Sequence, residues 1–296
     1  MTDSAARTQW GEGTNAEAIQ AWDGPLYDSF VRFRHIVTSG IGAHGEAALR
    51  LAPPQPGQRV LDIGCGFGDT TQQIARLVGP DGEAIGVDAA ARFVETAQHE
   101  AAEASVSNAR FAVADVEVTR FDERFDAAFS RMGTMFFANP VAALRNVREA
   151  LVPGGRLTMV VWRRRIDNDW LYRAQTIVEG IVERPEEYDE PTCGPGPFSM
   201  ADADTTSEIL LRAGFADVSL HRCDLPILVG NDVDEAIELV MALGPAGEIL
   251  RLAGDRAAHL HGQVHDALKA GLAEFQGPDG MAAGASTWIV SATNPD

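Results

Sequence analysis

The stretch Arg59-Val-Leu-Asp-Ile-Gly-Cys-Gly-Phe-Gly-Asp-Thr-Thr71 determines how the rest of the chain is interpreted. Its apolar run at residues 60–63 is long enough for a buried strand, and the pattern of residues 70–78 predicts a helix. Three glycines, Gly64, Gly66 and Gly68, connect the two. A glycine turn of this kind lets a ligand approach the backbone and directs the free N–H groups of the helix toward that ligand. The stretch therefore predicts a site for a nucleotide-like ligand.

Two ligand classes are compatible with this turn. Dinucleotide-binding folds use the spacing Gly-x-Gly-x-x-Gly. Here the spacing is Gly64-x-Gly66-x-Gly68, and the acid Asp62 precedes it by two residues. This Asp-x-Gly-x-Gly-x-Gly order resembles the first motif of the class I S-adenosylmethionine-dependent methyltransferases. Since a glycine match alone is weak, the two interpretations have to be separated by the rest of the chain.

An acid follows the second predicted strand. Residues 83–87 are the second predicted strand, which ends on Asp88 at the offset from the glycines that is expected for a ribose ligand. A carboxylate at this place can accept hydrogen bonds from both ribose hydroxyls. The alternative is that Asp88 only caps the helix predicted for residues 89–104.

The third and fourth predicted strands also end on polar residues. Residues 110–114 are followed by Asp115 and Val116, and the strand after Phe125 ends at Ser130. In the resembled family, an acid placed like Asp115 accepts the adenine amino group and the next backbone N–H reaches a ring nitrogen. The alternative for Asp115 is an ordinary loop residue. The resemblance places Ser130 beside the methionine part of the cofactor.

The same resemblance assigns further cofactor contacts around the glycine turn. Gly64, Cys65 and Gly66 would approach the methionine and the sugar through their backbone, and Asp62 would bond the amino group. Ala89 would contact the cofactor next to Asp88. A Leu-x-Pro-Gly-Gly-x-Leu sequence at residues 151–157 is another hallmark of that family. The chain is most similar to its small-molecule enzymes, those grouped with the quinone-biosynthesis C-methyltransferases, although it lacks a clear copy of their N-terminal signature.

Alternating strands and helices over residues 59–162 predict the α/β class, with an open parallel sheet covered by helices on both faces. The resemblance implies a Rossmann-like, seven-stranded, mostly parallel, doubly wound sheet with helical cap insertions. We expect an N-terminal tail and helical cap at 1–54, the cofactor-binding core at 55–165 and an insertion at 166–203. Residues 204–296 would complete the sheet, with a helical insertion at 223–285.

Composition restricts the partners and the location. The 296 residues include 43 acids against 24 Lys plus Arg, a formal net charge of −19, which disfavours nucleic acid and anionic membranes. The three cysteines are far apart in the sequence, so we expect a reducing cytoplasm and neither a disulfide framework nor a metal site. No apolar run is long enough to cross a membrane, and the oligomeric state is not predicted.

The segment 16–41 is rich in aromatic residues at helical intervals and is broken near Gly24-Pro25. Trp22, Tyr27, Phe30 and Phe33 either pack in the core or line a substrate pocket. We expect one or two amphipathic helices here that contribute to an acceptor pocket.

The resulting hypothesis is a methyltransferase that moves a methyl group from S-adenosylmethionine to a small-molecule acceptor by in-line displacement. A base is needed only if the acceptor carries a proton, and the candidates are His35, His44 and His221. One alternative is an NAD(P)-dependent oxidoreductase on a Rossmann-type sheet. Another is an S-adenosylmethionine-binding protein without turnover.

Overall fold

A computed structural model describes residues 15–183 and 195–295 of the chain. Its centre is a sheet in the order β3-β2-β1-β4-β5-β8-β6, with a two-residue strand, β7, pairing with β8. The pairs from β3 to β5 are parallel, whereas β8 is antiparallel to both β5 and β6. This arrangement confirms the predicted mostly parallel, doubly wound sheet. The bounds are β1 Arg59–Ile63, β2 Glu83–Asp88, β3 Ala109–Val113, β4 Phe125–Arg131, β5 Leu151–Trp162, β6 Ala216–Gly230, β7 Gln276–Gly277 and β8 Gly280–Thr293.

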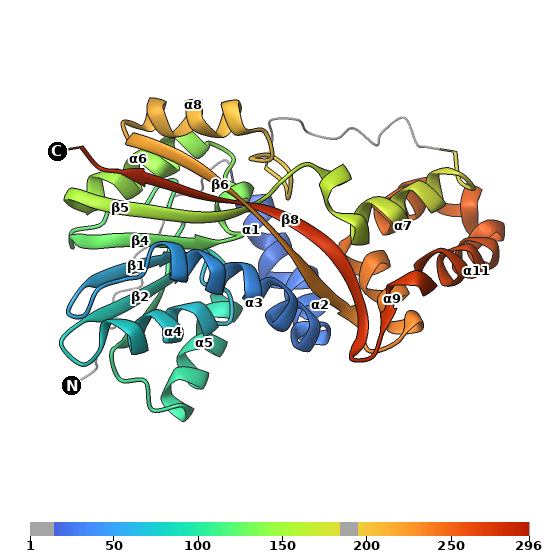
Figure 1. Cartoon of the computed structure of the whole chain (residues 1–296), viewed down its shortest axis with the longest axis horizontal. Helices are drawn as coiled ribbons and strands as arrows, with labels where there is room; N and C mark the ends of the chain where they lie inside the picture. The colour runs from blue at the N-terminus through green and yellow to red at the C-terminus, as the bar shows by residue number, and fades with distance from the viewer. Residues whose placement is uncertain (1–14, 184–194, 296) are drawn as a thin grey trace, which may run out of the picture.

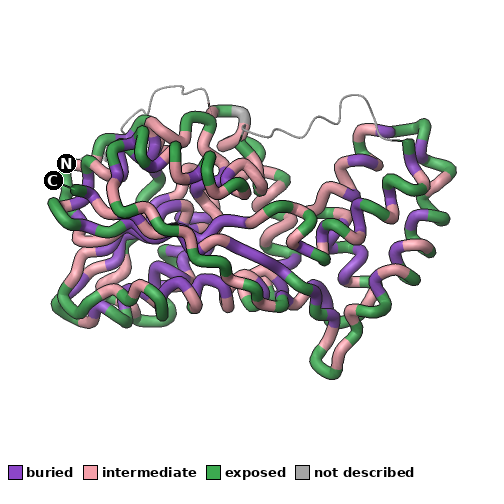
Figure 2. The backbone as a smooth tube through the Cα atoms, turned by 45° about the horizontal axis from the view of Figure 1, so that its top comes forward, coloured by how far each residue is buried: buried purple, intermediate pink, exposed green. Residues whose placement is uncertain are grey.

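Helices cover both faces of the sheet. Figure 1 shows α3, α4 and α5 on one face and α6 and α8 on the other. Their bounds are α3 Arg34–Leu51, α4 Asp69–Val78, α5 Ala91–Glu103, α6 Pro140–Ala150 and α8 Ala203–Ala213. Figure 2 shows that buried residues follow the strands and the inner sides of these helices. The right-handed crossovers of such a fold bring the carboxyl ends of the parallel strands to one edge.

Two helices carry caps of the residue types that favour these positions, whereas Asp88 does not cap α5. Asn139 accepts a hydrogen bond from the Ala142 N–H at the start of α6, and Gly214 ends α8 in the left-handed conformation at φ +94°. Asp88 is not the cap of α5, because that helix begins at Ala91 with Ala90 before it. The carboxylate of Asp88 instead faces the glycine turn.

The two last long strands extend farther than predicted. The sequence pattern suggested that β6 ends at Arg222 and that β8 begins at Ser286, but pairing continues to Gly230 opposite Met281. Pro226 obscured this extension, because proline is tolerated mainly in edge strands, and β6 is the edge of the sheet. The resulting ribbon leads away from the sheet to a group of helices (Figure 1). These are α7 Asp169–Glu179, α9 Val233–Leu243, α10 Pro245–Ala253 and α11 His261–Leu272.

The N-terminal segment is a broken helix, as its sequence predicted. It consists of α1 Ala16–Ala21, a π-helical turn at Trp22–Leu26 and α2 Tyr27–Arg32, with non-helical angles at Gly24. Helix α3 then runs to Leu51, ten residues beyond the expected end, and packs closely on β6. A Cβ atom at Gly40 would lie 3.1 Å from the Leu228 carbonyl oxygen, so the small residue permits this approach. Within the described ranges, no helix combines the length and apolar character needed to cross a membrane.

The glycine turn between β1 and α4 has left-handed backbone at all three glycines. The φ angles of Gly64, Gly66 and Gly68 are +67°, +53° and +80°. A Cβ atom at Gly68 would also lie 2.7 Å from the ring of Phe111, whereas nothing lies within 4 Å of one at Gly66. Glycine is therefore required at Gly68 for both conformation and space, and at Gly66 for conformation alone.

These two positions give a matched test of the turn. Gly66→Ala should lower the free energy of unfolding by about 1 kcal/mol, the cost of left-handed backbone for a residue with a Cβ atom. Gly68→Ala should cost about 1–3 kcal/mol more, because it adds collisions with the Phe111 ring and, at 2.8 Å, with the Ala97 Cβ atom. Urea unfolding of both variants measures the difference. Equal losses would show that Phe111 and Ala97 both adjust freely to an added Cβ atom.

Candidate functional site

One large cavity follows the carboxyl edge of the sheet and continues between the N-terminal helices and α9 and α10. Its volume is about 1240 Å³, above the roughly 300–1,000 Å³ of a typical small-molecule pocket. The cavity therefore has room for two ligands side by side. We call its two halves the glycine-turn end and the aromatic end. The first is lined by Gly64–Gly66, Asp69, Asp88, Ala89, Asp115, Val116 and Arg131, and the second by Trp22, Leu26, Phe30, Met132, Met135, Phe136, Trp162, Trp170, Phe198 and Leu243.

The backbone of the glycine turn forms one wall of the cavity. Gly64, Cys65 and Gly66 all line it, and the space beside the Gly66 Cα is open. The Cys65 side chain is buried, and burial together with the neighbouring carboxylates raises the pKa of its thiol well above the usual range. A protonated, buried thiol is a poor nucleophile, so Cys65 acts as a small packing residue.

Asp88 presents a carboxylate at the end of β2. Its Oδ2 accepts a hydrogen bond from the Gly66 N–H and its Oδ1 accepts one from the Ala90 N–H, both at 3.0 Å. Burial raises the pKa of Asp88, and these two N–H groups oppose the shift by stabilising the charged form. A carboxylate offers about four acceptor sites, so Asp88 keeps capacity for a ligand's hydroxyl groups.

Asp115 and Val116 lie in the loop after β3, and both line the cavity. Asp115 Oδ1 accepts a hydrogen bond from the Glu117 N–H at 2.9 Å. Two residues that the sequence did not single out hold this loop. The amide of Asn146 donates to the Val116 and Glu117 carbonyls, and the Glu117 carboxylate accepts from the N–H groups of Ala138 and Asn139.

Asp62 and Ser130 do not line the cavity, in contrast to the expected cofactor contacts. Asp62 is 1% exposed beneath the turn, where its Oδ2 accepts a hydrogen bond from the Thr71 hydroxyl at 2.6 Å. Ser130 is fully buried and donates to the Ile63 carbonyl at 2.8 Å. Strand alternation explains the difference, because these two side chains point into the protein rather than past the strand ends. Asp62 thus connects β1 to α4, and Ser130 connects β4 to β1.

An ion pair at the glycine-turn end was not predicted. Arg131 Nη2 lies 2.6 Å from Asp69 Oδ2, and both residues line the cavity. Arg131 is the last residue of β4 and Asp69 is the first residue of α4. A sequence signal was present, because an arginine closes the strand that is expected to face the methionine part of the cofactor, but its partner belongs to another element.

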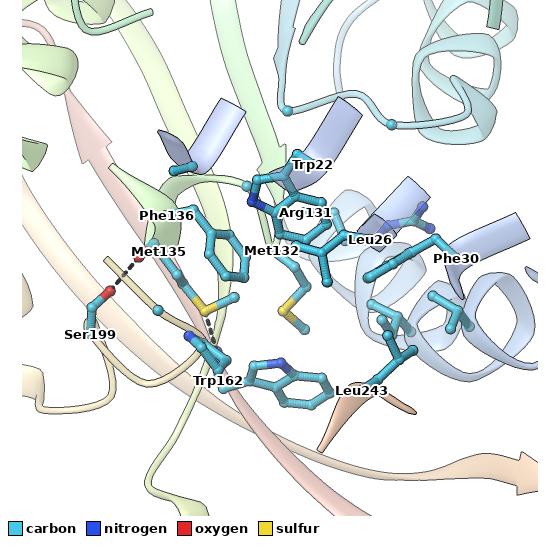
Figure 3. A pocket seen from close by; sticks show the side chains of 18 of the residues that line it. Trp22, Leu26, Phe30, Arg131, Met132, Met135, Phe136, Trp162, Ser199 and Leu243 are labelled. Carbon is cyan, nitrogen blue, oxygen red and sulfur yellow. Dashed lines mark hydrogen bonds between the residues drawn. The ribbon is translucent and has the colours of Figure 1, made fainter. Parts of the chain in front are cut away.

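Of the four aromatic residues expected in the substrate pocket, two line the cavity. Figure 3 shows Trp22, Leu26 and Phe30 from the N-terminal segment across from Trp162 and Leu243. Phe33 is instead a core residue, 2% exposed. Tyr27 also lies outside the lining.

The side chain of Tyr27 fastens the N-terminal segment to α5. Its hydroxyl forms a 2.7 Å hydrogen bond with Thr96, and the Arg92 guanidinium lies 4.0 Å from its ring centroid. Asp23 Oδ1 accepts a hydrogen bond from the Arg92 N–H, and Asp28 forms an ion pair with the Arg92 side chain. Tyr27 thus holds the cavity wall in place from outside.

Residues after β4 complete the aromatic end. Met132 has a left-handed backbone, φ +64°, which is uncommon for a residue with a long side chain and brings the chain back across the strand end. Met135 Sδ accepts a hydrogen bond from the Trp162 N–H at 3.3 Å, and the Ser199 hydroxyl donates to the Met135 carbonyl at 2.6 Å (Figure 3). These bonds join β5 and the segment around Ser199 to the cavity wall.

None of the three candidate histidines is among the residues that line the cavity. His35 is exposed on α3 and lies 2.8 Å from Glu235. His44 is fully buried, where Nδ1 bonds the Thr287 hydroxyl at 2.9 Å and burial lowers its pKa. His221 is exposed on β6. All three histidines therefore lie outside the cavity wall.

Comparisons with known proteins agree with this architecture. A sequence model described as a methyltransferase domain matches residues 54–204. The chain is 34% identical over 122 residues to the ubiquinone/menaquinone biosynthesis C-methyltransferase of Pseudomonas aeruginosa, covering 40% of this chain and 48% of the relative. It is 35% identical over 114 residues to the aklanonic acid methyltransferase of Streptomyces sp. strain C5, covering 38% and 52%. The chain thus spans about half the length of the curated relatives it matches.

Two solved structures share the fold at low sequence identity. The YcgJ protein of Bacillus subtilis superposes with a TM-score of 0.55 at 21% identity, covering 86% of this chain and 99% of that chain. Phosphoethanolamine N-methyltransferase 2 of Haemonchus contortus, solved with S-adenosyl-L-methionine, superposes with a TM-score of 0.51 at 18% identity, covering 86% and 53%. At these identities the likeness concerns the fold.

The burial of Asp62 predicts how the stability of the protein changes with pH. Burial raises its pKa to about 7, against the opposing effects of the Thr71 hydroxyl and the Arg131 charge. Between pH 4 and 7 the folded protein therefore holds a proton on Asp62 that the unfolded chain releases. The stability contributed by this proton is present at low pH and is lost as the pH rises through 7.

Asp62→Asn carries no such proton. The difference in unfolding free energy, variant minus wild type, should rise by a few kcal/mol, on the order of 1.4 kcal/mol per pKa unit, from pH 4 to pH 8. Urea unfolding of the ligand-free proteins at several pH values measures it. The surface variant Asp255→Asn is the control, and its difference in unfolding free energy from wild type should not change with pH. If the difference for Asp62→Asn also stayed constant with pH, the raised pKa of Asp62 would be contradicted.

Proposed function

The chain belongs to the methyltransferase-domain family, and from this we propose that it transfers a methyl group from S-adenosylmethionine to a small, largely apolar acceptor. The observation that carries the proposal is the two-ended cavity, with hydrogen-bonding groups at the glycine-turn end and aromatic side chains at the other. The curated relatives support a small-molecule acceptor, because one acts in quinone biosynthesis and the other on aklanonic acid. A net charge of −19 disfavours a nucleic acid acceptor.

The residues of the glycine-turn end fit the adenosine part of this cofactor. Asp88 has acceptor capacity left after its two backbone hydrogen bonds, which suits the two ribose hydroxyls. Asp115 and Val116 would hold the adenine, in a loop that Asn146 keeps in shape. The open space beside Gly66 admits a ligand close to the backbone. Gly64, Cys65 and Ala89 would complete the contact surface.

The protein's task in the reaction is chiefly alignment. S-adenosylmethionine supplies a methyl group on a positively charged sulfur, which is electrophilic without further activation. The glycine turn and Asp88 hold one partner at the sheet edge, while Trp22, Phe30 and Trp162 enclose the other and exclude water. An acceptor that carries a proton on its attacking atom would need a base.

We propose further that the acceptor is neutral and contains aromatic rings. Trp22 and Phe136 meet edge to face with centroids 4.9 Å apart, and Met132 and Met135 add polarizable sulfur. Besides Arg131, three arginines line the cavity and have partners within the protein: Arg164 bonds Asp167, Arg165 bonds Gln175 and Arg251 bonds Glu248. A charged acceptor would lose its hydration without gaining a free counter-charge. We also propose a cytoplasmic location, which the widely separated cysteines support.

Cofactor binding separates this proposal from the nicotinamide alternative. Calorimetric titration should show binding of S-adenosylhomocysteine and none of NADH. Asp88→Asn should weaken S-adenosylhomocysteine binding by on the order of 10- to 100-fold, the loss of charged hydrogen bonds to the ribose. The control Asp81→Asn removes the same charge from an exposed turn and should change nothing. Binding of NADH in place of S-adenosylhomocysteine would contradict the proposed function.

Acceptor chemistry can be tested with probes of matched size. In the presence of saturating S-adenosylhomocysteine, 2-naphthol should bind at least about 10-fold tighter than 2-naphthoate. The carboxylate of 2-naphthoate would lose its hydration in the cavity without a counter-charge to replace it. Leu243→Trp should fill the aromatic end and abolish 2-naphthol binding without changing the affinity for S-adenosylhomocysteine. Leu211→Trp, at a position 58% exposed, is the control. Tighter binding of 2-naphthoate would show that the acceptor is an anion.

A further inference from the structure

We propose that a second, smaller pocket at the amino edge of the sheet binds a single free α-amino acid with an apolar side chain. The pocket has a volume of about 220 Å³ and is lined by residues of α3, α4, β1, β4 and β5 and of the loop before β1. No described residue lines both this pocket and the large cavity. The inference therefore goes beyond the proposed function and does not depend on it.

The inner wall of this pocket is apolar. Leu49 of α3, Val60 of β1, Ile74 of α4 and Phe129 of β4 line it, and each is at most 5% exposed. A short hydrocarbon group placed against this wall would be removed from water, which favours binding. The volume is below the roughly 300–1,000 Å³ of a site for a drug-sized molecule, so the pocket selects a smaller ligand.

Two polar residues of β5 lie on one side of the pocket. Arg156 and Thr158 both line it, and they are two positions apart in the strand, so their side chains are on the same face of the sheet. Among the described residues, the exposed Arg156 side chain has no hydrogen-bond or ion-pair partner, and neither has the hydroxyl of Thr158, which is 4% exposed. Arg59 at the same edge, by contrast, pairs with Glu83. A free guanidinium fork beside a hydroxyl group suits a carboxylate.

A negative charge comes from β4. Asp126 lines the pocket next to Ala127, the residue that is paired with Arg156 across the two strands. Its Oδ2 accepts a hydrogen bond from the Arg59 N–H at 2.7 Å, which leaves Oδ1 able to accept one from a ligand. Helix α3 ends at Leu51, next to the lining residues, and its last carbonyl groups carry partial negative charge. Both features favour a positively charged group.

The two charges of the pocket do not neutralise each other. In the ranges 15–183 and 195–295, no ion pair joins Arg156 to Asp126, although they lie on neighbouring strands. A simple anion would meet the repulsion of Asp126, and a simple cation would meet that of Arg156. An α-amino acid carries a carboxylate and an ammonium on one carbon, so it satisfies both residues at once. Its side chain then fills the apolar wall.

The binding test compares L-leucine with two analogues that each lack one charge. In calorimetric titrations, L-leucine should bind at least about 10-fold tighter than 4-methylpentanoate, which lacks the ammonium, and 3-methylbutylamine, which lacks the carboxylate. Saturating S-adenosylhomocysteine should leave the affinity for L-leucine unchanged, because the two pockets share no residue. Competition between the two ligands would place L-leucine in the large cavity and overturn the inference.

Substitutions assign the two charges. Arg156→Gln should weaken L-leucine binding by roughly 10- to 100-fold without weakening that of 3-methylbutylamine, because the amine has no carboxylate to lose. Asp126→Asn should weaken L-leucine without weakening 4-methylpentanoate. Thr158→Val has nearly the same shape and should weaken only the two ligands that carry a carboxylate. Arg256→Gln, at an exposed position that lines neither pocket, is the control and should change nothing.

The variants are chosen to remain folded. Arg156 is exposed, and an asparagine at position 126 still offers an oxygen to the Arg59 N–H. Melting temperatures check this. Selective loss of L-leucine binding in the Arg156 and Asp126 variants would support the amino acid pocket. It would be overturned if wild-type protein bound no L-leucine at about 10 mM, if 4-methylpentanoate or 3-methylbutylamine bound as tightly as L-leucine, or if folded Arg156→Gln protein kept the full affinity.

Discussion

The whole site depends on a close contact between the glycine turn and the segment after β4, where two glycines let the backbones meet without side chains between them. A Cβ atom at Gly64 would lie 2.9 Å from Gly133 Cα, and one at Gly133 would lie 2.8 Å from the Ile63 carbonyl oxygen. This approach lets the segment after β4 cross in front of the glycine turn. It therefore brings Arg131 beside α4 and Met132 into the aromatic end, so one close contact shapes both halves of the cavity.

The charged side chains around the glycine turn balance one another, although the protein as a whole is strongly acidic. Asp62 is kept in a buried position by the Thr71 hydroxyl and the nearby charge of Arg131, and burial still raises its pKa to about 7. Asp69 compensates Arg131 in turn. Because a buried carboxyl without partners would be costly, this compensation allows a carboxyl group to lie directly beneath the glycine turn.

The N-terminal segment forms part of the wall of the aromatic end, and side-chain contacts on its outer side attach it to neighbouring helices. Asp23 and Tyr27 bond α5, and Arg34 links α3 to both α4 and α5. Phe33 and Ile36 are buried in the core, so the N-terminal segment is part of the folded body. Removing it would expose core residues as well as open the cavity, which makes single substitutions the cleaner way to study it.

The sequence by itself determined the sheet, the glycine turn and the row of strand ends, because hydrophobic periodicity and glycine spacing act over a few neighbouring residues. It therefore predicted that Asp88 and Asp115 reach the sheet edge. Only the tertiary structure decided that Asp62 and Ser130 point inward and that Phe33 joins the core. It also decided that Asp69 meets Arg131, 62 residues away in the chain. Such outcomes depend on side-chain direction and on packing between distant elements, and a local pattern carries no information about either.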